Sequence, residues 1–154
     1  VEDVMTPRTV MVMANESEKL ADFYQTHGFK TFSRFPVYTE NRDNVSGMVL
    51  KDDLLTELVE NQGDKKVDDI KREIVVLLDN LSLRAAFHSM NKKRGHLAVV
   101  VDEHGSLRGL ITLEDIFETL FGMEFIDESD TVEDMRKFAR NRWEQRAKSL
   151  GLID

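Results

Sequence analysis

The sequence repeats itself at a fixed distance. Residues 109–115, Gly-Leu-Ile-Thr-Leu-Glu-Asp, echo residues 47–53, Gly-Met-Val-Leu-Lys-Asp-Asp, and both ends of the match lie 62 residues apart (109 − 47 and 115 − 53). The same offset aligns apolar residues before and after the match: Val37 with Val99, and Leu54, Leu55, Leu58 and Val59 with Ile116, Phe117, Leu120 and Phe121. A repeat of this length is a duplicated supersecondary unit. Two copies imply two related clefts, and differences between the copies indicate which cleft binds a ligand.

The length limits how the two copies are arranged. A chain of 154 residues can form one core, or two small halves that share one, but not two independent domains of typical size. We expect a first repeat at residues 1–63, a second at 64–126, and an acidic loop followed by a C-terminal helix at 127–154. The chain begins at Val1 without an initiator methionine, so we expect it to be part of a longer protein.

Hydrophobic spacing predicts the order β-α-β-β-α in each unit. In the first unit we expect strands at 10–12, 35–38 and 45–50, a helix capped by Ser17, and a helix from Lys51 to about Asn61. In the second unit we expect strands at 74–78, 97–101 and 107–111, a helix capped by Ser82, and a helix at 113–121. The predicted fold class is therefore α/β (α+β), with two repeats packed around a pseudo-two-fold axis and an added C-terminal helix.

Composition excludes several functions. The absence of cysteine removes disulfides, thiolate catalysis and cysteine-bound zinc, and the four histidines lack metal-ligand spacing. A net charge of −8 argues against nucleic-acid binding, because an acidic surface repels the phosphate backbone. No apolar run approaches the roughly 20 residues of a membrane span. No nucleophile, base or carboxylate pair has catalytic spacing, so we do not expect an enzyme.

The copy at residues 109–115 has the character of an anion site. It runs from the end of a strand into the first turn of a helix, where unsatisfied N–H groups attract anions and the Thr112 hydroxyl adds a donor. Asp115 is an ionised acceptor of the kind that binds ribose hydroxyls. The same residues are also ordinary helix-capping residues. The first copy has Leu50 in place of Thr112, so the second copy is the better candidate.

Several motifs together resemble a tandem pair of CBS domains, the Bateman module, and more narrowly that of the CorC/CNNM, or hemolysin-like, family of magnesium and cobalt transport proteins. They are Val4-Met5-Thr6-Pro7-Arg8, Ser33-Arg34-Phe35-Pro36-Val37-Tyr38, residues 96–103 (HLAVVVDE) and residues 109–116 (GLITLEDI). The resemblance implies a regulatory module on the cytoplasmic face of a membrane protein. It implies AMP or ATP as regulatory ligand between the repeats, a homodimer, and a transmembrane domain of the parent protein as partner.

The resemblance also assigns nucleotide-binding roles to individual residues. Thr112 and Asp115 resemble the phosphate and ribose contacts, Ser33 and Arg34 a phosphate contribution from the other repeat, and Thr6, Val10 and Phe35 the surroundings of the adenine. Whether Mg²⁺ accompanies the nucleotide stays open. Residues 102–105 (DEHG) predict a hairpin turn, with carboxylates that could also hold that ion. The alternative function is a purely structural dimerisation module without ligand.

Overall fold

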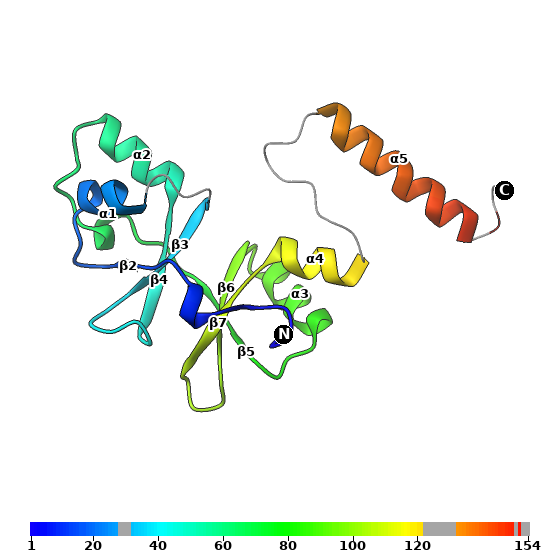
Figure 1. The fold of residues 1–154 in the computed structure, drawn as a ribbon, viewed down its shortest axis with the longest axis horizontal. Helices are drawn as coiled ribbons and strands as arrows, with labels where there is room; N and C mark the ends of the chain where they lie inside the picture. The colour runs from blue at the N-terminus through cyan, green and yellow to red at the C-terminus, as the bar shows by residue number, and fades with distance from the viewer. Residues whose placement is uncertain (28–31, 122–131, 150, 152–154) are drawn as a thin grey trace.

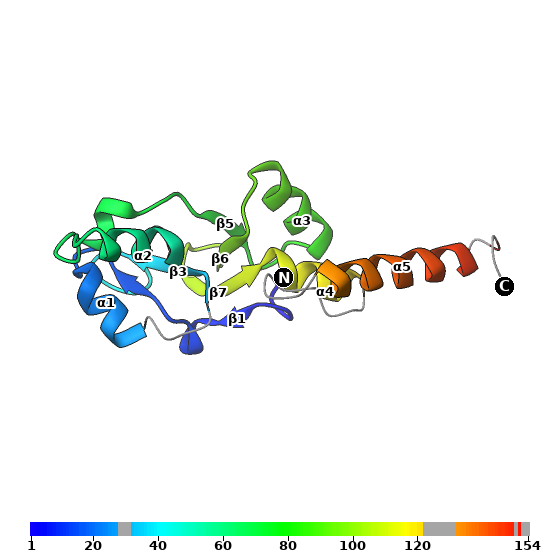
Figure 2. The same cartoon turned by 90° about the horizontal axis from the view of Figure 1, so that it is seen from above.

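A computed structural model describes residues 1–27, 32–121, 132–149 and 151 (Figure 1). The acidic loop expected at 127–130 lies outside these residues, whereas the C-terminal helix is present as α5 (Val132–Ser149). Figure 2 shows α5 extending beyond α4, at the end of the molecule opposite α1 and α2. Among the described residues, no helix has both the length and the hydrophobicity needed to cross a lipid bilayer.

Two small sheets with their helices confirm the predicted fold class. The first half has the strand order β2-β3-β4 and consists of β2 (Ala14–Asn15), α1 (Leu20–His27), β3 (Arg34–Tyr38), β4 (Val45–Leu50) and α2 (Lys51–Val59). The second half consists of β5 (Val75–Leu78), α3 (Leu83–Lys92), β6 (Leu97–Val101), β7 (Leu107–Thr112) and α4 (Leu113–Phe121). In both halves the first strand is parallel to its neighbour and the next pair is antiparallel.

Each half borrows a segment from elsewhere in the chain. Strand β1 (Thr6–Pro7) pairs with β7, so the sheet of the second half reads β1-β7-β6-β5, and the N-terminus lies beside that half in Figures 1 and 2. The short 3₁₀ helix η2 (Val67–Ile70) packs against the first half, and Arg72 bridges to Met48 of β4. The two halves are therefore interlocked through their terminal segments.

Three apolar clusters form the core. One lies inside each half, between the sheet and its helices, and includes the fully buried residues Leu54 in the first half and Ile116 in the second. The third joins the two sheets: Met11 and Met13 of the first half pack with Val99 and Leu107 of the second. Burial of Val99 on one side and of Val100 on the other explains why β6 is continuously apolar.

Two predictions about the start of the chain are wrong. Residues 10–12 do not form a strand: η1 (Arg8–Val10) is a 3₁₀ helix, because this stretch passes from one sheet to the other without a neighbouring strand to pair with. Ser17 does not cap the first helix, which begins at Leu20. The N–H groups of Leu20 and Ala21 donate instead to the carbonyl groups of Lys65 and Gly63 in the connector. The predicted cap at Ser82 is confirmed, since its Oγ accepts from the Ala85 N–H at 3.1 Å.

The register of the repeat also differs from the sequence alignment in one strand. Gly47 and Gly109 are equivalent by the 62-residue offset of the repeat. They pair with Val37 and Val100 respectively. Val37 therefore corresponds to Val100 and not to Val99. The cause is a difference in hairpin length. The stretch between Tyr38 and its partner Val45 is one residue longer than the stretch between Val101 and its partner Leu107. Ser33 consequently corresponds to His96, and both carbonyl groups accept the first N–H of the following helix.

Candidate functional site

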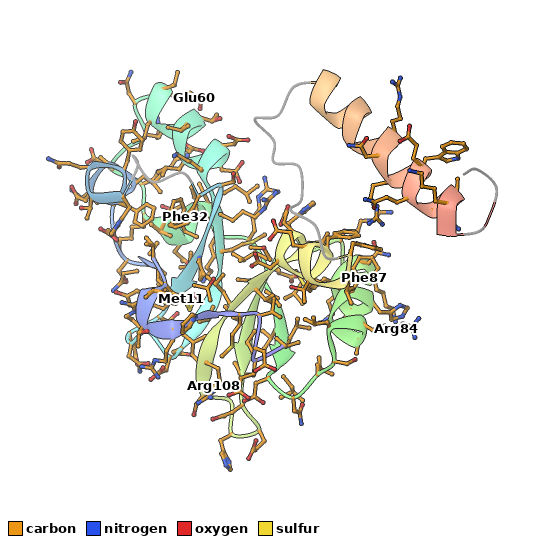
Figure 3. The ribbon with its side chains drawn as sticks, turned by 45° about the vertical axis from the view of Figure 1, so that its right-hand side comes forward. Met11, Phe32, Glu60, Arg84, Phe87 and Arg108 are labelled. Carbon is orange, nitrogen blue, oxygen red and sulfur yellow. The ribbon has the colours of Figure 1, made fainter. Side chains whose placement is uncertain are left out.

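A cleft of about 420 Å³ lies where the first half meets the junction of β7 and α4. Its volume is in the range of small-ligand sites. Its lining residues are Thr6, Val10, Met11, Val12, Phe32, Ser33, Arg34, Pro36, His96, Leu97, Leu110, Thr112, Glu114 and Asp115. Six of the seven predicted site residues are among them, all except Phe35. Met11 and Phe32, labelled in Figure 3, belong to the first half, whereas α4 comes from the second.

Thr112 and Asp115 are brought together by the start of α4. The Asp115 N–H donates to the Thr112 Oγ1 at 3.1 Å, and the Thr112 N–H donates to the Asp115 Oδ2 at 3.3 Å. This reciprocal arrangement is a capping box with aspartate in place of glutamate. The Thr112 hydroxyl, which accepts here, retains its hydrogen for donation, and the carboxylate retains further acceptor capacity. Both residues can therefore cap the helix and still bind a ligand.

The backbone at this helix end contributes less to anion binding than its position predicts. The Leu113 N–H donates to the His96 carbonyl at 3.0 Å, and the Asp115 N–H is taken by Thr112. These two donors are satisfied within the chain. Side chains in the cleft, above all a cation, are therefore needed to compensate for these two donors in binding an anion.

Arg34 provides that cation. It begins β3 and is partly buried, and its side chain lines the cleft opposite α4. Within the described part of the chain, no carboxylate lies within ion-pair distance of its guanidinium, whereas Arg8, Arg72 and Arg108 all form ion pairs. Ser33 is held beside it, because its carbonyl accepts the Lys51 N–H at 2.9 Å. The positive charge at Arg34 is thus available to a ligand.

The N-terminal segment forms another wall of the cleft. Thr6 lies on β1, and Val10 at the end of η1 is 64% exposed. Strand β1 can approach β7 closely only because residue 109 is glycine: a Cβ at this position would overlap the carbonyl oxygen of Thr6. Gly109 thus allows the backbone of β1 to lie directly against β7.

Phe35 does not line the cleft. Its side chain is 1% exposed and packs edge-on against Phe23 in the core of the first half. Successive side chains of a strand point to opposite faces, so Arg34 and Pro36 face the cleft while Phe35 faces the core. The aromatic side chain at the cleft is Phe32, which is half exposed. The alternation of β3 was the sequence signal that could have placed the Phe35 side chain in the core.

The equivalent cleft of the other repeat copy is built differently. Leu50 stands where Thr112 provides a hydroxyl, and Asp53 is engaged by Arg72, whose Nε and Nη2 donate to its two carboxylate oxygens at 2.8 and 3.2 Å. Arg72 bridges to β4 in the same way as Thr6 pairs with β7, so these two residues are equivalent. The connection to the next strand differs in length: residues 73–76 separate Arg72 from Leu77, whereas residues 7–13 separate Thr6 from the equivalent residue Ala14. The three additional residues accommodate η1, which has no counterpart in the second repeat copy.

Residues 102–105 form the predicted hairpin turn and lie outside the cleft. The Asp102 Oδ1 accepts from the backbone N–H groups of Ser106 and His104, both at 2.9 Å. The Ser106 bond is the main cause that lowers the pKa of the Asp102 carboxyl below its usual value. His96 and Glu114, by contrast, line the cleft, although neither is among the seven predicted site residues.

Comparison with known proteins agrees with the two repeats of the fold. A family model described as "CBS domain" matches residues 1–60 and again residues 67–122. The chain therefore belongs to the CBS-domain family, as a tandem pair of the kind found in CNNM/CorC transporters.

The narrower relationship comes from individual proteins. The chain is 32% identical over 149 residues to the magnesium and cobalt efflux protein CorC of Escherichia coli, covering 96% of the chain and 51% of that protein. It is 33% identical over 150 residues to the UPF0053 protein sll1254 of Synechocystis, covering 97% and 43%. The chain thus spans about half the length of these relatives.

A solved structure provides a third comparison. It is the CBS domain of the bacterial CNNM/CorC family Mg²⁺ transporter in complex with ATP, which matches with a TM-score of 0.71 and 32% identity. The match covers 79% of this chain and 87% of that one.

Proposed function

We propose that the chain is an adenine-nucleotide-sensing regulatory module of a CorC/CNNM-like magnesium and cobalt transport protein, and that AMP or ATP binds between its two repeats. The observation that carries the proposal is the cleft in which Arg34 of the first half faces Thr112 and Asp115 of the second. The ATP complex of a CBS domain 32% identical to this chain supports the choice of ligand.

The side chains in the cleft suit the three parts of a nucleotide. Val10 and Phe32 offer exposed apolar surface for a planar base, and Thr6 adds a hydroxyl beside them. Asp115 accepts hydrogen bonds from the ribose hydroxyls. Arg34, Ser33 and Thr112 donate to phosphate oxygens, with Arg34 contributing a charge-assisted contact.

A ligand in this position regulates by holding the two halves together. It contacts residues of both halves at once, so it stabilises the relative arrangement that brings them closest. A nucleotide that binds one arrangement more tightly than another shifts the population toward it. We expect this shift to be transmitted at the cytoplasmic face of the membrane to the transmembrane domain of the parent protein.

The exposed apolar residues on α2 and α4 support a homodimer. Val59 and Phe121 occupy equivalent positions on these helices and are 82% and 49% exposed. Apolar side chains repeated on two helices of a small domain form a surface that association buries. Sedimentation velocity measures the oligomeric state of the wild-type chain and of Val59→Lys. A wild-type chain that sediments as a monomer at all concentrations contradicts the homodimer.

Calorimetric titration with ATP and AMP, each with and without Mg²⁺, tests nucleotide binding. We expect Asp115→Ala to abolish measurable binding, because the ribose loses its acceptor. Asp53→Ala is the matched control: it removes the corresponding carboxylate of the other repeat copy, which Arg72 already engages, and we expect it to leave the affinity unchanged. The proposal fails if wild-type protein gives no heat with millimolar nucleotide, or if Asp115→Ala binds as the wild type does.

One observation favours a second candidate function, a structural dimerisation module without ligand. The capping box between Thr112 and Asp115 is complete within the chain, so both residues have a structural role that needs no nucleotide. On this reading, replacing Thr112 alters stability alone. The stability of Thr112→Ala and its affinity for ATP, measured together, separate the two functions.

A further inference from the structure

The charged side chains that line the cleft do not balance the charge of a nucleotide. Arg34 contributes one positive charge, whereas Glu114 and Asp115 contribute two negative charges. The other lining residues are uncharged apart from His96. With a neutral imidazole the lining therefore has a formal charge of −1, which opposes a ligand with several phosphates.

His96 is placed to change that balance. It precedes β6, and its carbonyl accepts the first N–H of α4, so it lies at the same helix end as Asp115. Its side chain is about half exposed, and its Nδ1 is 4.0 Å from the Glu114 Oε1. This distance is too long for a direct hydrogen bond, so the imidazole is not committed to Glu114. In the first half the equivalent position is Ser33, which has no charge.

Histidine is the side chain whose charge ordinarily changes between about pH 5 and 8. Protonation of His96 would convert the charge of the cleft lining from −1 to zero. It would also give the cleft a second cation, contributed by the second half, whereas Arg34 comes from the first. A single phosphate needs one cation, and a chain of three gains from two.

We propose that His96 is the residue that makes the cleft prefer a nucleoside triphosphate over a monophosphate, and that it links this preference to proton concentration. The inference rests on the proposed nucleotide site and adds its selectivity. Glu114 is the positioning residue, because its carboxylate attracts the imidazolium toward the cleft. Arg34 contacts either ligand and sets the common affinity.

Calorimetric titration of ATP and of AMP at about pH 6 and about pH 8, in buffer without divalent ions, tests the proposal. The measured quantity is the ratio of the AMP Kd to the ATP Kd. We expect the wild-type ratio to be about fivefold larger at the lower pH, the effect of one added charge pair at contact distance in water. ATP itself takes up protons in this range, so each variant is compared with the wild type at the same pH.

Three variants separate the possibilities. His96→Gln should lose the additional ATP preference at low pH, and His96→Arg, which keeps its charge, should show that preference at both pH values. His104→Gln is the matched control, because His104 also stands beside a carboxylate, that of Glu103 at 3.7 Å, but lies on the hairpin outside the cleft. It should behave as the wild type does.

Two results would overturn the inference. If His96→Gln keeps the wild-type change of the ratio with pH, or if His96→Arg leaves the ratio at the higher pH unchanged, His96 does not select the phosphate number. Absence of binding by the wild type with both nucleotides refutes the proposed function itself, and this inference with it. Nucleotide binding without a contribution from His96 refutes the inference alone.

Discussion

Removing the hydroxyl of Thr112 separates capping from ligand binding. In Thr112→Ala the Asp115 N–H loses its acceptor at 3.1 Å, and loss of such a cap costs about 1 kcal/mol. For a chain of 154 residues this corresponds to a decrease of about 2–4 °C in the melting temperature. If the hydroxyl also donates to a phosphate, the variant loses a hydrogen bond to a charged group, about 1.5 kcal/mol or roughly tenfold in the Kd of ATP.

Ser82→Ala is the matched control for this prediction. Ser82 caps α3 through the same kind of bond, from the Ala85 N–H at 3.1 Å, and lies outside the cleft. We expect both variants to lose similar stability in differential scanning calorimetry, but only Thr112→Ala to bind ATP more weakly in isothermal titration. Thr112→Ser keeps the hydroxyl and should restore both properties. The ligand role of Thr112 is refuted if Thr112→Ala binds ATP as tightly as Ser82→Ala does.

Three further predictions concern the stability of the fold. Gly109→Ala should lower stability by about 1–3 kcal/mol and weaken ATP binding, because the added Cβ displaces β1 and Thr6. Gly105→Ala is the control: residue 105 has a φ of 81°, which strains an alanine, but it lies on the hairpin. This variant should lower stability without changing the affinity for ATP. The hydrogen bond from Lys71 is the main cause that lowers the pKa of Glu16. The stabilisation that the ionised Glu16 contributes is therefore fully present above the ordinary glutamate pKa and is lost as the pH falls through the lowered pKa. As the pH is lowered from about 6 to about 3, the urea midpoint should therefore fall less in Glu16→Gln than in the exposed control Glu73→Gln. Equal decreases in the two variants would contradict this prediction. Leu54→Ala and Ile116→Ala, equivalent and fully buried, should each cost about 2–5 kcal/mol in one cooperative urea transition, and two separate transitions would show that the halves unfold independently.

Local pattern was sufficient to predict most elements of the repeat. The bounds of β4, β6 and α4 agree with the expected residues, because apolar spacing and flanking turn residues are local properties. The cap at Ser82 was predictable for the same reason. Features that depend on distant residues were not. The N–H groups at the start of α1 are satisfied by Gly63 and Lys65, which no local sequence rule could indicate.

The candidate site shows the same division. The contrast between Thr112 and Leu50 is visible in the sequence and indicated which copy to favour. The ion pair between Asp53 and Arg72 is not visible, since it depends on where the connector meets β4. His96 was not among the predicted nucleotide-binding residues, because a single histidine before a strand has no signature that assigns it a role. Its position becomes informative only when the carbonyl contact with Leu113 and the lining of the cleft are known.

The pairing of β1 with β7 has a consequence for the order of folding. Thr6 and its partner Leu110 are 104 residues apart. During synthesis β1 therefore cannot pair until nearly all of both repeats has been made. Contacts of such long range form late, because loop closure must be complete before they contribute. The sheet of the first half can form beforehand, but the sheet of the second half and the wall that carries Thr6 are complete only after β1 pairs with β7. The cleft is therefore completed late in folding, and a ribosome-bound chain that stops before β7 lacks it.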